Sequence, residues 1–292
     1  MTRATRERRD TLRRLGACAL AACAWPVAAQ GPRAPRLVTV SGAITEVVFA
    51  LGAESQLVGT DTTSLYPEAA RRTPKVGYMR QLSAEGLLSL KPDAVIVTTE
   101  SGPPVVLDQL RAAGVRLELV EADHSWGEVQ RKVAAVGRAA AREPQARELV
   151  TRLDAEWSEV QQRVAADAAG TRKPRVLFVL SHSASPQVSG EKTAAHAAIG
   201  FAGGVNCLSG FQGYRPMTAE AMASAAPDVI LTTTQSIEAH GGAEKFWQRP
   251  ELALTPAFRK RALVTQDALL LLGFGPRLPL AISELHKSFR AA

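Results

Sequence analysis

One pattern occurs twice in this chain and limits the folds that the chain can adopt. Leu82–Thr99 (LSAEGLLSLKPDAVIVTT) aligns without gaps to Met217–Thr234 (MTAEAMASAAPDVILTTT). Each copy reads as a short helix with Ser or Thr at its N-cap, then a Pro-Asp turn, then a buried strand. A helix–turn–strand unit that is used twice, far apart in the chain, predicts two lobes of one design. The loops ahead of the copies, GYMRQ and GYRPM, are then expected to lie at equivalent places.

Residues 1–29 have the pattern of a secretory signal peptide. A stretch with six arginines precedes an apolar run, Leu15–Trp25, that is too short to span a bilayer, and Val27–Ala29 forms a small-residue cleavage site. Arg8–Arg13 resembles a twin-arginine export motif, so Sec and twin-arginine export both stay open. Leu20–Cys23 resembles a lipobox, which would lipidate Cys23. We expect an exported protein, with a lipid-anchored form as the alternative.

Composition argues against several classes of function. The signal region carries six arginines against Glu7 and Asp10, so its removal lowers the formal net charge from +7 to about +3, too small a bias to indicate nucleic-acid binding. If Cys23 leaves with the signal region, Cys207 stays alone, and no disulfide framework is expected. The five histidines lack the spacing of a zinc or manganese site. Without a nucleophile–base pair, a Gly-rich phosphate loop or paired carboxylates, no enzyme is predicted.

Alternating strands and helices predict an α/β fold with two Rossmann-like lobes, each built on a parallel sheet. The expected N-terminal lobe covers residues 36–124 and the expected C-terminal lobe covers residues 171–292. Between them, residues 125–170 lack strand signals, and their Val, Leu and Trp residues recur every three or four positions. This spacing predicts one long connecting helix, with a kink before Pro144 as an alternative.

Three motifs, in this order, resemble the class III periplasmic substrate-binding proteins of metal-chelate importers. They are TVSGAITEVVFALGAESQLVGTD from Thr39, GYMRQLSAEGLLSLKPD from Gly77 and LLLLGFGPRLP from Leu269. The run VGYMRQLSAEG is similar to the haem-receptor branch in particular. The resemblance implies small lobe motions, a cleft that holds haem as the transported ligand, delivery to a dimeric ABC permease, and supply by an outer-membrane haem receptor system. A ferric-siderophore or cobalamin receptor on the same scaffold is the alternative.

Tyr78 is the predicted ligand of the haem iron. A phenolate oxygen is a hard anionic donor that suits ferric iron. In an extended loop, Arg80 lies on the same side as Tyr78, where its charge would favour the phenolate. The resemblance assigns these two roles to the same two residues. The alternative is that Tyr78 only packs on the lobe surface, as we expect of Tyr66 in the turn before Pro67.

The second lobe is expected to complete the site. His182 follows a buried strand and is a candidate second iron ligand, with polar lining as its alternative. Tyr214 is expected to face the cleft, and Arg215 and Arg277 are candidate contacts of the haem propionates because guanidinium and carboxylate pair well. Whether one or two haems bind stays open.

Glu85 and Glu220 occupy the same position in the two copies of the repeat. The resemblance implies that this pair docks onto arginines of the two permease subunits. One exposed carboxylate on each lobe would suit a partner with two-fold symmetry. The alternative is that each glutamate belongs to a capping box at the start of its helix.

Overall fold

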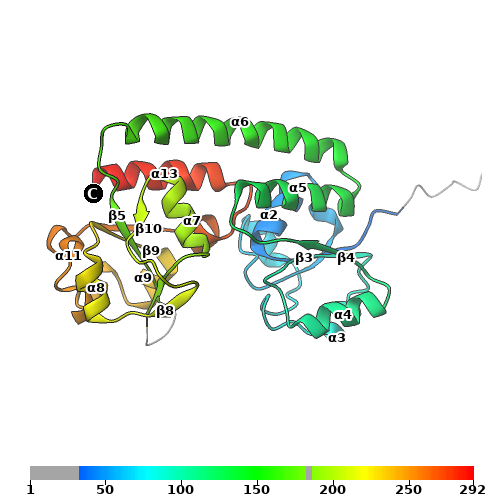
Figure 1. Ribbon diagram of the computed structural model, residues 1–292. Helices are drawn as coiled ribbons and strands as arrows, with labels where there is room; N and C mark the ends of the chain where they lie inside the picture. The colour runs from blue at the N-terminus through cyan, green and yellow to red at the C-terminus, as the bar shows by residue number, and fades with distance from the viewer. Residues whose placement is uncertain (1–32, 182–185) are drawn as a thin grey trace, which may run out of the picture. The chain divides into compact units, whose positions relative to one another are not determined.

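Residues 33–181 and 186–292 are described by the computed structural model. Residues 35–292 form one unit that contains two separate β-sheets (Figure 1). We call residues 35–140 the N-terminal lobe and residues 175–292 the C-terminal lobe. The predicted signal peptide and His182 lie outside the described residues.

The first sheet is parallel, as predicted, with the strand order β2-β1-β3-β4. Every residue of β1 and β3 is buried, which fits runs such as LVTV and AVIVT that are apolar on both faces. The strands are β1 Leu37–Val40, β2 Leu57–Thr60, β3 Ala94–Thr98 and β4 Arg116–Val120. The helices of this lobe are α2 Gly42–Ala50, α3 Ala84–Ser89, α4 Pro104–Ala112 and α5 Trp126–Ala140, with 3-10 turns η1 Glu54–Gln56 and η2 Glu68–Arg72.

The second sheet is mixed, so the prediction of a parallel sheet is wrong for this lobe. Its central strand β5 pairs in parallel with β7 and β9, and β9 with β10, but β6 and β8 join antiparallel. Those two strands have only three residues each, QVS and YRP, too few to show a strand period. The strands are β5 Arg175–Leu180, β6 Gln187–Ser189, β7 Val205–Asn206, β8 Tyr214–Pro216, β9 Val229–Thr233 and β10 Leu263–Gln266. The helices are α7 Ala194–Phe201, α8 Ala219–Ala225, α9 Thr234–Ala239, α10 Ala243–Trp247, η3 Pro250–Leu252, α11 Pro256–Lys260, α12 Ala268–Leu272 and α13 Leu278–Ala291.

The repeated unit has the same construction in both lobes, which confirms the prediction of a helix, a turn and a strand in each copy. The first copy forms α3 and β3, and the second forms α8 and β9. The N-cap hydroxyl of Ser83 accepts a hydrogen bond from the Gly86 N–H, and that of Thr218 accepts one from the Ala221 N–H. Each cap satisfies one of the free N–H groups at the start of its helix.

The Pro-Asp turn ties each copy to the first long strand of its own sheet. Asp93 accepts a hydrogen bond from the Arg36 N–H at 2.7 Å, and Asp228 accepts one from the Arg175 N–H at 2.9 Å. The two guanidinium groups in turn donate to carbonyl oxygens at the C-terminal ends of α3 and α8, at 2.7 Å in both lobes. We call these contacts the arginine–aspartate pin. It joins helix, turn and strand into one rigid piece because it satisfies polar groups at the ends of all three.

Residues 125–170 form two helices, so the prediction of one long helix is wrong. The chain turns after α5 at Ala141, whose φ of 53° is left-handed, and α6 (Glu143–Ala168) folds back against α5. Gly137 permits the close approach, since a Cβ atom there would lie 2.6 Å from the Cβ of Ala146. No Val, Leu or Trp lies between Val136 and Leu149, so the apolar spacing is interrupted where the break falls, and Pro144 lies in the first turn of α6.

The connection between the lobes runs through α6 rather than through the whole predicted segment. This helix has 26 residues and is about 39 Å long at 1.5 Å per residue. It lies along α5 of one lobe and α13 of the other (Figure 1). Its buried stripe is Leu149, Leu153, Val160 and Val164. Within the described residues, no helix combines the length and the apolar character that a membrane crossing requires.

Candidate functional site

Tyr78 and Arg80 lie in the loop that leads into α3, the first copy of the repeat. Gly77 enters this loop with φ of 102°, a conformation that favours glycine. Arg80 Nη1 donates a hydrogen bond to the Tyr78 hydroxyl oxygen at 2.8 Å, and Tyr78 is 40% exposed. The structure therefore brings these two predicted residues together at an exposed position, with the phenol oxygen beside the Arg80 guanidinium.

Glu100 completes this cluster and was missed by the sequence analysis. It follows the buried strand β3, and its Oε2 atom lies 3.2 Å from Arg80 Nη2. The sequence feature that could have identified Glu100 is its position just beyond the carboxyl end of a parallel strand, where ligands bind in α/β sheets. Tyr78, Arg80 and Glu100 thus form one hydrogen-bonded row, which we call the Tyr78 cluster.

Tyr214 of β8 faces the Tyr78 cluster from the C-terminal lobe. Its ring packs against Phe178, with the ring centroids 6.5 Å apart. Although 37% of Tyr214 is exposed, desolvation of its hydroxyl raises the pKa of Tyr214 to about 12. The charge of Glu100 adds to this effect, and the charge of Arg80 opposes it. Two charged groups of one lobe therefore act on a hydroxyl of the other. The proton of Tyr214 is therefore harder to remove than that of an ordinary tyrosine, which disfavours the phenolate form that suits ferric iron.

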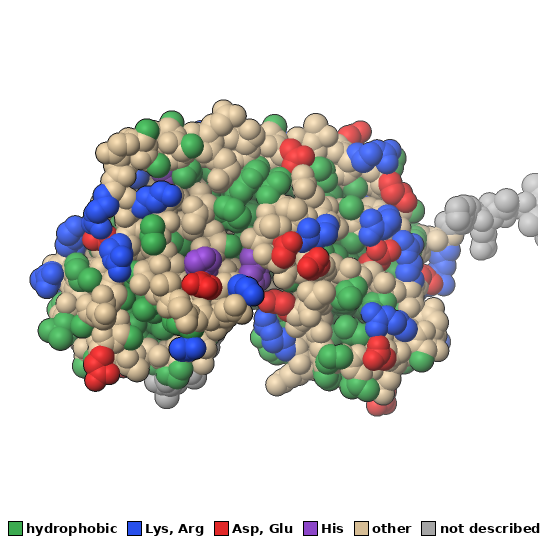
Figure 2. Space-filling model, viewed as in Figure 1, with side chains coloured by type: hydrophobic (Ala, Val, Ile, Leu, Met, Phe, Trp, Pro, Cys, Tyr) green, Lys and Arg blue, Asp and Glu red, His purple; other side chains and the backbone are tan. Residues whose placement is uncertain are grey.

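The molecule is hollowed between the two lobes, and charged and histidine side chains lie along the rim of the hollow (Figure 2). Arg215 follows Tyr214 on the exposed strand β8, and its guanidinium stacks on the Phe211 ring at 4.4 Å from the centroid. Among the residues that the structure describes, no carboxylate forms an ion pair with Arg215. Its charge is therefore available to an anionic ligand.

Arg277 forms an ion pair away from the Tyr78 cluster. Its Nε and Nη2 atoms donate to the two carboxylate oxygens of Glu46 at 2.7 and 2.6 Å. Its guanidinium also lies 3.6 Å from the centroid of the Tyr66 ring, so Tyr66 packs on it. All three residues line a separate cavity against α6. Because one edge of the guanidinium is already filled by a carboxylate, we leave Arg277 out of the proposed site.

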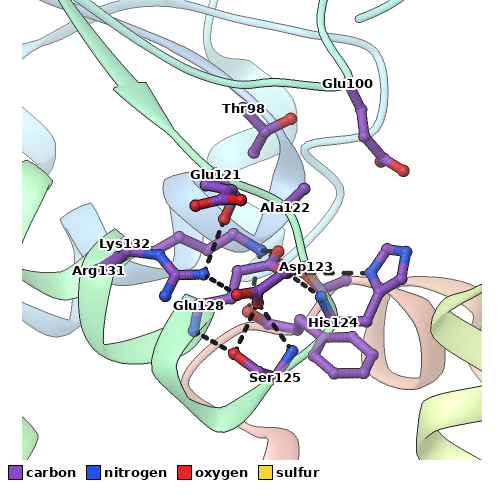
Figure 3. Close-up of polar contacts among 12 residues, drawn as sticks. Thr98, Glu100, Glu121, Ala122, Asp123, His124, Ser125, Glu128, Arg131 and Lys132 are labelled. Carbon is purple, nitrogen blue, oxygen red and sulfur yellow. Dashed lines mark hydrogen bonds and ion pairs between the residues drawn. The ribbon is translucent and has the colours of Figure 1, made fainter. Parts of the chain in front are cut away.

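A buried ion pair holds the two lobes together at their junction (Figure 3). Lys132 of α5 is 1% exposed, pairs with Glu128 one turn earlier, and donates to the Gly273 and Phe274 carbonyl oxygens at 2.8 and 3.0 Å. Glu128 also accepts a hydrogen bond from the His124 N–H at 2.7 Å. Burial lowers the pKa of Lys132, and the charge of Glu128 opposes this shift. We call these residues the Lys132 cluster. The sequence signal for it, also missed, was a charged pair at i and i+4 beside an apolar stripe.

Aromatic rings pack in series across the same junction. The Trp126 and Trp157 rings stack with centroids 4.8 Å apart, and Trp157 meets Phe201 edge-on at 5.0 Å. Phe201 then contacts Phe274 at 6.4 Å, and Phe274 contacts His124 at 5.4 Å. This series joins both lobes and α6, and pairs in such geometries stabilise beyond the area that they bury. The lobes therefore meet in packed aromatic surface beside the buried ion pair of the Lys132 cluster.

Glu85 and Glu220 are exposed at the starts of α3 and α8. Each is the second residue of its helix, one position before the residue whose N–H the N-cap hydroxyl accepts. A capping box would need the glutamate one position later. Across residues 33–181 and 186–292, neither carboxylate forms an ion pair or a side-chain hydrogen bond. Both are free for a partner.

The described residues offer little chemistry for a bare metal ion or a reactive thiol. No group of three or more His, Cys, Asp or Glu side chains among them is arranged to hold a metal ion. Burial raises the pKa of Cys207 to about 12, so its thiol stays protonated and unreactive at neutral pH.

A family model of the periplasmic binding proteins matches residues 37–269, which is most of the chain. The chain belongs to the periplasmic binding protein family. This confirms the family that the three sequence motifs predicted.

Solved structures of periplasmic binding proteins resemble this one over nearly their full length. The periplasmic heme-binding protein BhuT, in complex with two hemes, is 44% identical with a TM-score of 0.84, over 88% of this chain and 98% of that one. RhuT from Roseiflexus sp. RS-1, also a periplasmic heme-binding protein, is 37% identical with a TM-score of 0.83, over 89% and 99%. A periplasmic heme-binding protein from Pseudomonas aeruginosa is 34% identical with a TM-score of 0.80, over 89% and 94%.

Curated relatives of this periplasmic binding protein are more distant or shorter in overlap. The uncharacterized ABC transporter substrate-binding lipoprotein YvrC of Bacillus subtilis (strain 168) is 26% identical over 259 residues, 87% of this chain and 79% of YvrC. The vitamin B12-binding protein of Yersinia pestis (strain Pestoides F) is 32% identical, but only over 91 residues, 31% of this chain and 32% of that protein.

Proposed function

We propose that this periplasmic binding protein captures haem in the hollow between its lobes and delivers it to an ABC importer. The observation that carries the proposal is the 2.8 Å hydrogen bond from Arg80 to the exposed Tyr78 hydroxyl. The likeness to three heme-binding proteins, at 34 to 44% identity over 88 to 89% of this chain, supports it. Family and neighbours are binding proteins, and we propose no catalytic role.

Tyr78 would bind the ferric iron through its phenolate oxygen. Iron favours the anionic form of the oxygen, and the Arg80 guanidinium adds to this by donating a hydrogen bond to it. Arg80 therefore supports the ligand without touching the iron. His182 stays a candidate second ligand, and the number of haems stays open. Arg215, exposed on the facing strand, would contact a propionate.

Hemin titration tests the proposal against the cobalamin and ferric-siderophore alternatives. The mature protein, starting at Gln30, is titrated separately with hemin, cyanocobalamin and a ferric hydroxamate siderophore. We expect saturable binding of hemin with a shifted Soret band and a visible charge-transfer band of a high-spin ferric phenolate. Tighter binding of cyanocobalamin or of the siderophore than of hemin would contradict the proposal. The short overlap with the vitamin B12-binding protein makes cobalamin the comparison that matters most.

Glu85 and Glu220 would dock the loaded protein onto the permease dimer. Both carboxylates are exposed and occupy equivalent positions in the two lobes. A partner with two-fold symmetry would meet one carboxylate with each subunit.

The double charge reversal Glu85→Lys/Glu220→Lys is expected to lower hemin import into proteoliposomes at least about tenfold, because like charges would meet across the interface. Hemin affinity in solution should not change, since neither residue lies in the Tyr78 cluster. Glu54→Lys, which alters an exposed glutamate on η1, is the matched control and should import normally. Equal import by the double variant and the control would exclude docking through these residues.

Export through residues 1–29 belongs to the same proposal. Cleavage after Ala29 would release the protein into the periplasm, and lipidation of Cys23 would instead anchor it. Mass spectrometry of the protein purified separately from the membrane fraction and from the membrane-free periplasmic fraction distinguishes the two, because only the lipidated form begins at residue 23.

A further inference from the structure

The backbone places Glu100 beside Arg80. The Gly102 N–H donates to the Met79 carbonyl oxygen at 2.9 Å, and the Leu82 N–H donates to the Gly102 carbonyl oxygen at 2.9 Å. These two bonds join the loop after β3 to the loop that carries Tyr78. The position of Glu100 next to Arg80 is therefore built into the backbone and does not depend on the ion pair alone.

The ion pair between Arg80 and Glu100 has little value for stability. The two side chains are 50% and 40% exposed, and ion pairs at such exposed positions contribute little to folding. Arg80 is the ion-pair partner of Glu100 among the described residues, and in Figure 3 no dashed line joins Glu100 to the residues drawn there. The backbone thus holds the Glu100 carboxylate beside Arg80 although their ion pair adds little stability. We therefore look for a role of Glu100 in ligand binding.

The propionate groups of haem would compete with the Tyr78 oxygen for Arg80. Each haem carries two propionates, and a guanidinium binds carboxylates through two parallel hydrogen bonds. A propionate that captured Arg80 would draw Nη1 away from the Tyr78 oxygen, where it now donates at 2.8 Å. Glu100 already accepts from Nη2, and its negative charge repels a second carboxylate from the same edge.

We propose that Glu100 is a positioning residue, an inference that rests on the proposed function. Glu100 keeps the hydrogen bond from Arg80 to the Tyr78 oxygen in place and prevents the haem propionates from binding this guanidinium. The propionates would then turn toward the C-terminal lobe. Arg215 on β8 offers them an exposed guanidinium that has no carboxylate partner among the described residues. Glu100 would thus help to select one orientation of haem in the hollow.

The test compares hemin with hemin dimethyl ester, whose propionates are uncharged. In Glu100→Gln the amide oxygen can still accept a hydrogen bond from Arg80, but the repelling charge is gone. With hemin, we expect this variant to show a shifted ferric phenolate charge-transfer band and about tenfold faster dissociation than the wild type. With the dimethyl ester, the variant and the wild type should agree in both measurements, because no charged propionate competes for Arg80.

Glu121→Gln is the matched control. It removes the same charge from an exposed glutamate just after β4, and the contact made there to Arg131 uses the backbone carbonyl. This control should behave as the wild type with both ligands. Equal changes with hemin and with the ester would overturn the inference by showing a general structural effect, and unchanged hemin dissociation in Glu100→Gln would overturn it as well. If the wild type bound neither ligand, the proposed function itself would fail.

Discussion

Tyr78→Phe is expected to abolish the ferric phenolate band of the hemin complex and to weaken hemin binding at least about 100-fold, about 2.8 kcal/mol. Phenylalanine keeps the ring but removes the oxygen that would bind the iron. It also leaves Arg80 Nη1 without the acceptor that it has at 2.8 Å. Since Tyr78 is 40% exposed, the substitution removes little packing, and the variant should fold normally. Visible spectroscopy and hemin titration measure both effects.

The chain supplies its own controls for this experiment in Tyr66 and Tyr214, the other two tyrosines. Tyr66→Phe changes a ring that packs under Arg277, and Tyr214→Phe changes a phenol whose pKa burial raises to about 12. Both variants should keep the charge-transfer band, with hemin affinity within about threefold of the wild type. Loss of the band in Tyr214→Phe and its retention in Tyr78→Phe would transfer the ligand role to the other lobe.

Lys132→Met is expected to lower the free energy of unfolding by about 3–5 kcal/mol. The lysine side chain is 2% exposed and that of Glu128 is 3% exposed, so removal of the cation leaves a buried carboxylate without its partner. The carbonyl oxygens of Gly273 and Phe274 lose their donor as well. Urea unfolding, followed by the fluorescence of the stacked Trp126 and Trp157 pair, measures the change.

A second substitution distinguishes the effect of the unpaired buried Glu128 carboxylate from the effect of lost packing. Lys132→Met/Glu128→Gln neutralises the carboxylate and should be more stable than Lys132→Met alone. Lys287→Met, which removes an exposed lysine from α13, should change the free energy of unfolding by no more than about 0.5 kcal/mol. A double variant as unstable as the single one would show that the buried charge is not the cause.

The parts of the fold that sequence could predict are those that repeat locally. The Pro-Asp turn, the capped helix and the buried strand are written into each copy of the pattern, and both copies fold as predicted. The loop ahead of the first copy brings Tyr78 and Arg80 together through a separation of only two residues. The family followed from three motifs in order, and the family model matches residues 37–269.

What the sequence could not predict depends on contacts between distant segments. Glu100 meets Arg80 because two loops are joined through Gly102, and no local pattern marks that pairing. Lys132 finds its acceptors 141 and 142 residues later in the chain. The reversal of the chain after α5 depends on the close approach of Gly137 to Ala146, and the antiparallel strands β6 and β8 are too short to carry a period of their own.

The arginine–aspartate pin has a mechanical consequence. It fastens the C-terminal end of α3 to the start of β1 and the C-terminal end of α8 to the start of β5. A pull on either helix is therefore passed to the first long strand of its sheet instead of being absorbed by a slack loop. Each lobe would therefore move as one body together with the helix that carries Glu85 or Glu220.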